Sequence, residues 1–136
     1  MAFPTAGSGT QLGDGNELSP LFYAQAAPIT FTASFTTTPE QLAGNGLYVG
    51  NPAAASNLTL PTVAQLEAAF PAISEKVGTA FWFNVINLNA TNAITIVTNT
   101  GWTITGGGSM TVALSTSAGF LARKTGAGTW QLYRES

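Results

Sequence analysis

The sequence predicts an all-β fold: an antiparallel β-sandwich, jelly-roll-like, of about seven to eight strands with one or two short helices and an extended N-terminal arm. Three observations predict it. From Pro28 to Thr36, apolar side chains alternate with hydroxylated ones, as in a half-buried strand. After Gly78, short apolar runs alternate with turn sequences, which is typical of sandwiches and barrels. Before Pro28, glycine and proline interrupt every possible period.

Residues 1–27 form the predicted arm, and residues 28–136 form the predicted sandwich domain. Large apolar side chains are spread through the arm, although a disordered tail is usually poorer in them. Two interpretations are open. The arm folds back on its own domain, or it docks on a neighbouring chain through backbone hydrogen bonds and a few apolar anchors. The candidate contacts between subunits are Phe3, Leu12, Leu18, Leu21, Phe22 and Tyr23.

The first part of the domain combines strands with a short helix. Residues 29–36 read as one strand with an apolar and a hydroxylated face. Thr38, Pro39 and Gln41 form a capping-box pattern, which predicts a one-turn helix ended by Gly44. A second short strand is expected over residues 47–49.

A second capping box, Thr62 to Gln65, predicts a helix of about two turns that ends before Pro71. Val63, Leu66 and Phe70 form an apolar stripe at helical spacing. A short amphipathic helix usually covers the end of a sheet, so we expect Leu66 and Phe70 to lie in the core.

The remainder of the chain is predicted as strands and turns. Residues 80–88 carry large side chains on both faces, with Phe83 on one and Trp82 on the other. This pattern indicates a central strand with one face toward the core and the other toward a partner or the helix. The expected strands cover residues 80–88, 93–98, 102–105, 110–115, 119–124 and 129–134.

Composition excludes several classes of chemistry. The chain of 136 residues has no His and no Cys, which removes imidazole catalysis, thiol nucleophiles, disulfides and the usual zinc sites. The chain has only four basic residues and a formal charge of −2, so it offers no basic surface that would bind phosphates. Nucleic-acid binding is therefore not expected. The chain also lacks the continuous apolar run of a membrane span, and no membrane partner is expected.

The six carboxylates are dispersed, and no nucleophile elbow, phosphate loop or dinucleotide motif occurs. A hydrolase built on two of these carboxylates is the weak alternative. Residues 13–17 offer oxygen ligands but lack the ligand count and spacing of an EF-hand. We therefore expect no enzyme activity, no metal and no cofactor.

Charged residues make up only 7% of the chain, against about 25% in typical soluble domains. A folded monomer of 14.0 kDa exposes about 6,700 Å², so its ten charges are unusually sparse. This scarcity favours a surface that other chains partly cover. The alternative is a monomer solvated by Thr, Ser, Asn and Gln.

The second half of the chain resembles a β-rich module of virion surface proteins, including tailed-phage capsid decoration (cement) proteins and related spike or fibre modules. The resemblance covers about residues 58–136. The segments that carry it are Leu60-Pro61-Thr62, Gln65-Leu66, Ala68-Ala69, Gly78-Thr79-Ala80-Phe81-Trp82-Phe83, Val85-Ile86-Asn87, Ile94-Thr95-Ile96, Gly101-Trp102-Thr103-Ile104 and Gly128-Thr129-Trp130-Gln131-Leu132-Tyr133.

The resemblance implies a non-enzymatic β-sandwich, often a homotrimer, that binds the outside of an icosahedral shell and stabilises it. It implies the major capsid protein as partner and the capsid surface of the virion as location. The arm residues then become candidate capsid or intersubunit contacts. The alternative from a different class is a receptor- or glycan-binding module of a phage tail or head fibre, with Trp82, Trp102 and Trp130 as candidate sugar-stacking residues.

Overall fold

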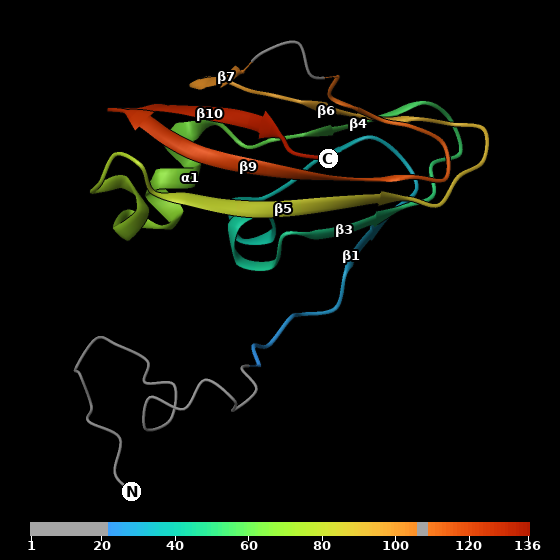
Figure 1. Cartoon of the computed structure of the whole chain (residues 1–136), viewed down its shortest axis with the longest axis horizontal. Helices are drawn as coiled ribbons and strands as arrows, with labels where there is room; N and C mark the ends of the chain where they lie inside the picture. The colour runs from blue at the N-terminus through green and yellow to red at the C-terminus, as the bar shows by residue number, and fades with distance from the viewer. Residues whose placement is uncertain (1–21, 106–108) are drawn as a thin grey trace, which may run out of the picture.

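The computed structural model describes residues 22–105 and 109–136, and within them the fold is all-β, as predicted. A six-stranded sheet has the order β1-β3-β5-β9-β10-β7, which Figure 1 shows from bottom to top, and a four-stranded sheet has the order β2-β4-β6-β8. The strands are β1 (Ile29–Phe31), β2 (Phe35–Thr36), β3 (Leu47–Gly50), β4 (Ser56–Thr59), β5 (Ala80–Asn87), β6 (Ile94–Val97), β7 (Trp102–Ile104), β8 (Thr111–Val112), β9 (Ser117–Gly126) and β10 (Thr129–Arg134).

The first six strands alternate between the two sheets. Strands β1, β3 and β5 lie side by side in the larger sheet, and β2, β4 and β6 lie side by side in the smaller one. Each return to the same sheet adds a parallel neighbour, because the chain has crossed the other sheet in between. The hairpin of β9 and β10 then extends the larger sheet with antiparallel pairs.

The expected antiparallel pairing is therefore wrong for much of the fold. Of the eight strand pairs in the described residues, five are parallel and three are antiparallel. Short alternating runs have the same side-chain pattern in either direction, so the direction depends on the connections. Here the connections pass through the opposite sheet.

Ten strands form within the described residues, rather than seven or eight. The run over residues 29–36 is not one strand, because the chain turns at residues 32–34 and crosses from the larger to the smaller sheet. The crossing is held by bonds from Asn51 N to Phe31 O, at 3.0 Å, and from Asn57 N to Ser34 Oγ, at 2.9 Å. Strand β4 was also not expected.

One hydrophobic core lies between the two sheets. Phe83 and Phe120 of the larger sheet stack with ring centroids 5.1 Å apart, and Leu58 and Ile94 enter the same core from the smaller sheet. Each fully buried side chain of this size contributes about 1.5–3 kcal/mol. Within the described residues, this core draws on side chains from both sheets and from α1.

Tyr48 is the main polar side chain inside this core. It is fully buried, and its hydroxyl shares a hydrogen bond with the Thr37 hydroxyl. Burial raises the pKa of Tyr48 to about 12, although the hydrogen bond with Thr37 acts in the opposite direction. The Tyr48 ring therefore packs as an apolar group while its hydroxyl remains satisfied.

The helices begin where the sequence predicts. Helix α1 (Val63–Ala69) carries the expected capping box: Thr62 Oγ1 accepts a hydrogen bond from Gln65 N at 3.1 Å, and Gln65 Oε1 accepts one from Thr62 N at 3.0 Å. Leu66 is fully buried and Phe70 packs against the core, as expected.

Two shorter helical segments occur, one before β3 and one directly after α1. Segment η1 (Glu40–Asn45) is a π-helix and follows the predicted reciprocal bonds between Thr38 and Gln41. It is longer than the expected single turn to Gly44. Segment η2 (Pro71–Ser74) is a 3₁₀ turn after α1.

Two glycines with positive φ provide a matched test of this packing. Gly101, at φ +94°, would place a Cβ 2.6 Å from the Val63 Cβ, whereas Gly128, at φ +66°, has open space around that position. We expect Gly128→Ala to cost only the backbone penalty of about 1–2 kcal/mol. Gly101→Ala adds overpacking of about 1–3 kcal/mol. Urea denaturation of both variants measures this difference, and equal losses would contradict the close contact between Gly101 and α1.

Candidate functional site

The N-terminal segment is held to the domain at a defined point just before β1. Gln25 Nε2 donates to Asn45 O at 3.1 Å and to Asn45 Oδ1 at 2.8 Å. Asn45 Nδ2 in turn donates to Ala27 O at 2.8 Å. Because Asn45 ends η1 and lies two residues before the start of β3, these bonds fix where the chain enters the larger sheet.

Two of the six predicted contact residues lie in the described part of the chain. Phe22 and Tyr23 are 83% and 88% exposed, so neither packs on the core of its own domain. In Figure 1, the blue segment that precedes β1 leads away from both sheets. The other four predicted contacts lie outside the described residues: Phe3, Leu12, Leu18 and Leu21.

The outer face of the larger sheet carries an apolar group of side chains. Phe83 and Val85 of β5 point into the core, so Trp82, between Phe81 and Phe83, points outward. The strand register places Leu121 of β9 opposite Trp82, and Tyr133 of β10 opposite Leu121. The outer apolar face, as the term is used below, consists of Leu47, Val49, Trp82, Ile86, Leu121 and Tyr133.

Trp82 is the most exposed member of this face, at 65%. Its indole N–H donates to Glu135 Oε1 at 2.8 Å, which fixes the side chain without covering it. We expected this face of residues 80–88 to contact either a partner or the helix. No described residue buries the Trp82 ring, so contact with a partner is the interpretation that stays open. Exposed aromatic side chains of this kind occur at interfaces more often than at ordinary surfaces.

A second polar cluster lies at the end of the core next to α1. Lys124 of β9 is 4% exposed, and its ammonium forms an ion pair with Glu67 of α1. The same carboxylate oxygen, Glu67 Oε2, accepts the indole N–H of the fully buried Trp130 at 2.9 Å. The helix is therefore attached to the sheet by a charged contact as well as by Leu66.

The pKa of Glu67 is determined by opposing effects. Burial acts to raise the pKa, but the hydrogen bonds from Lys124 and Trp130, together with the charge of Lys124, outweigh it and lower the pKa below its ordinary value. A carboxyl with a lowered pKa in the folded state stabilises the fold above its ordinary pKa. That stabilisation is lost as the pH falls through the lowered value.

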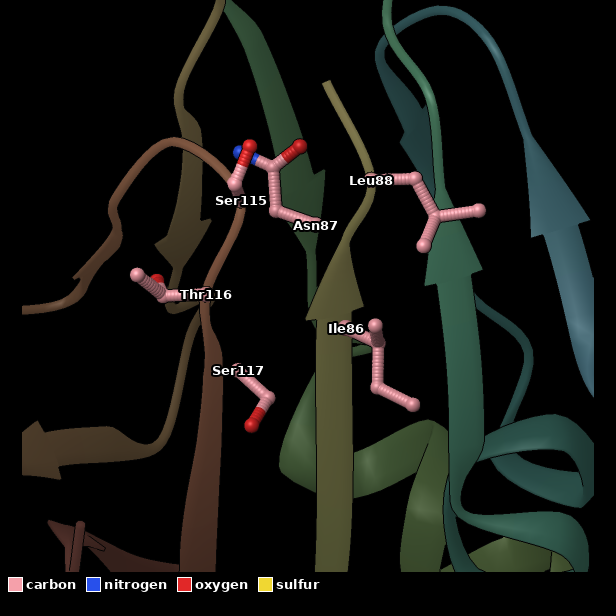
Figure 2. A pocket seen from close by; sticks show the side chains of 6 residues that line it. All are labelled: Ile86, Asn87, Leu88, Ser115, Thr116 and Ser117. Carbon is pink, nitrogen blue, oxygen red and sulfur yellow. The ribbon is translucent and has the colours of Figure 1, made fainter. Parts of the chain in front are cut away.

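A shallow hollow lies where β5 ends and β9 begins, and Figure 2 shows the six side chains around it: Ile86, Asn87, Leu88, Ser115, Thr116 and Ser117. The Asn87 amide is already occupied, because Nδ2 donates to Asn92 O at 2.9 Å and Oδ1 accepts from Asn89 N at 2.9 Å. No charged side chain lines the hollow. It offers hydroxyl groups and the exposed Leu88, but no group suited to acid–base chemistry.

The carboxylates do not gather into a reactive cluster in the described ranges 22–105 and 109–136, which contain no group of three or more acidic residues placed to hold a metal ion. Glu67 is engaged by Lys124 and Trp130, and Glu135 by Trp82. Asp14 and Glu17 lie outside the described residues. Among the helices of that described part, none is long and apolar enough to cross a membrane.

Comparisons with models of protein families, with curated proteins and with solved structures find no match to this chain.

Substituting Glu67 tests the ion pair. We expect Glu67→Gln to lower the free energy of unfolding by about 3 kcal/mol at neutral pH, because Lys124 remains buried without a counter-charge. Glu40→Gln, at an exposed position on η1, is the control and should change stability by less than about 0.5 kcal/mol.

The same two variants test the sign of the pH dependence. The wild type should lose part of its stability as the pH falls below the ordinary carboxyl range, and Glu67→Gln should lose less over that interval. Urea denaturation at a series of pH values measures both effects. An identical pH dependence in Glu67→Gln and the wild type would contradict the assignment.

Proposed function

We propose that this protein is a structural virion protein, a decoration or cement protein that binds the outside of an icosahedral shell and stabilises it by bridging subunits. In this proposal the two sheets are the layers of a sandwich-like module with no catalytic role. The major capsid protein is the partner, and the capsid surface is the location.

The observation that carries the proposal is the exposure of two large aromatic side chains where the described chain begins. The described residues share one hydrophobic core, while Phe22 and Tyr23 remain exposed beyond the anchor formed by Gln25 and Asn45. Apolar residues that the domain does not need for its own core are available to bind another chain. Such a segment adds contact area without requiring a larger globular domain.

The charge distribution agrees with attachment through apolar contacts. The described residues carry four basic groups and four acidic groups, Glu40, Glu67, Glu75 and Glu135, so their formal charge is zero. The remaining two acidic residues of the chain, Asp14 and Glu17, account for its net charge of −2. A nearly neutral body approaches other copies and a protein shell without strong long-range repulsion.

Stabilisation of the shell follows from differential binding. A protein that binds the assembled lattice but not its separated subunits stabilises the lattice by RT ln(1 + [L]/Kd) for each site. In an oligomer with one arm per chain, the second and later contacts form at a high effective concentration. No reaction is required, in keeping with the dispersed carboxylates of the described residues.

Deleting residues 1–24 tests the role of the arm and keeps Gln25 in place. The truncated protein should retain its unfolding transition, because the core begins at Phe31, but lose binding to shells assembled without this protein. Co-sedimentation with such shells measures binding, and circular dichroism checks the fold. Saturable binding by the truncated protein at the wild-type affinity would contradict the proposal.

A glycan-binding module is the second candidate, and one observation favours it. Trp82 is exposed, with Glu135 hydrogen-bonded to its indole and Asn84 exposed on the same face. Aromatic faces beside polar groups bind sugars, whereas Trp102 and Trp130 are buried and unavailable.

If this second candidate holds, Trp82→Ala should abolish binding on a glycan array, and Leu114→Ala, at a distant exposed position, should preserve it. The absence of glycan binding by the wild-type protein would remove this candidate and leave the first unaffected.

A further inference from the structure

The outer apolar face is a feature of the described residues that the proposed function has not used. Its half with strands β1, β3 and β5 is parallel, and parallel sheets are almost always covered on both faces. The core covers the inner face only. Leu47, Val49 and Ile86 remain half-buried on the outer side, next to the exposed Trp82.

The N-terminal segment enters the domain beside this face. Asn45, which holds Gln25 and Ala27, is followed by Gly46, whose carbonyl accepts a hydrogen bond from Asn84 N at 2.8 Å. Asn84 lies two residues after Trp82 on β5. The residue after the anchor therefore contacts β5 two residues from Trp82, the exposed end of the outer apolar face.

The segment that precedes this anchor has suitable length and chemistry to cover such a face. Residues 1–21 can span up to about 70 Å when extended, which is enough to reach a neighbouring subunit. They contain apolar residues but no Lys or Arg, and their acidic residues are Asp14 and Glu17. The outer side of the larger sheet carries one charge of each sign: Arg123, two positions beyond Leu121 on β9, and Glu135, which is bonded to the Trp82 indole. Arg123 is the cation that this face offers to the carboxylates of the arm.

We propose that the outer apolar face binds the N-terminal arm, residues 1–21, of a second copy of this chain. This inference rests on the proposed function in one respect, the assignment of the arm as a contact element. Phe22 and Tyr23 argue for a second copy, because a chain that turned back directly onto the sheet would bury them there. Head-to-tail donation of each arm to the next copy around a rotation axis produces a closed ring, such as the expected trimer.

The absence of cysteine makes disulfide trapping a direct test. Two sets of single variants are prepared, with Gln11→Cys or Ser19→Cys in the arm and Asn84→Cys on the face, so that the apolar side chains stay intact. Each variant then carries a single cysteine. When an arm variant and the face variant are mixed under mild oxidation, a disulfide between the two sites must join two different chains. Asn57→Cys, exposed on β4 of the other sheet, is the matched control.

We expect the mixed disulfide between an arm variant and Asn84→Cys to form at least about tenfold faster than the one with Asn57→Cys. Equal rates of disulfide formation with Asn84→Cys and with Asn57→Cys would overturn the proposal. A double variant, Ser19→Cys with Asn84→Cys, gives the remaining outcome: a bond formed only within one chain shows that the arm covers its own sheet, which also overturns the proposal.

A second measurement separates this inference from the proposed function. In sedimentation velocity, the wild type should associate, and Trp82→Asp should weaken association by at least about tenfold, while Leu114→Asp should not. A wild type that stays monomeric at all concentrations overturns the docking inference. Shell binding by that monomer would still support the proposed function, so the two failures are distinguishable.

Discussion

The packing of two sheets around one core determines the rest of this structure. Phe83 and Val85 are fully buried between the sheets, and because side chains alternate along a strand, Trp82 and Asn84 must point outward. The register with β9 and β10 then places Leu121 and Tyr133 beside Trp82. The position of the outer face is thus a geometric consequence of the core. Its unusual property is that apolar and aromatic side chains, Trp82 above all, occupy it.

The polar groups of the domain are used mainly for construction. In the described residues, Glu67 and Lys124 form the single salt bridge, and the same carboxylate holds Trp130. Asn45 fixes the N-terminal segment, and the side-chain amide of Asn87 joins the turn at Asn89 and Asn92 to Val112 of β8. No buried side-chain polar atom there lacks a hydrogen-bond partner. The polar side chains inside the domain thus serve its packing, which agrees with the proposed role as a protein that acts by contact.

Local features of the fold could be predicted from the sequence, and long-range ones could not. The capping boxes at Thr38 and Thr62 act over three residues, so their patterns correctly located both helix starts. Strand direction, the break at residues 32–34 and strand β4 depend on pairing between distant segments. The same holds for Lys124, which meets Glu67 only across the fold. Of the predicted contact residues, Phe22 and Tyr23 are exposed, whereas the position of Trp82 at the surface required the register of three strands.

The central claim is that the outer apolar face is covered when the protein is assembled. Trp82 is a natural probe, since Trp102 and Trp130 are buried in the isolated chain. The most direct measurement is acrylamide quenching of fluorescence across a concentration series, with Trp82→Phe subtracted as background. The account predicts that Trp82 becomes protected from acrylamide as subunits associate. Trp82 fluorescence that stays equally quenchable in the dilute and the assembled protein would contradict it.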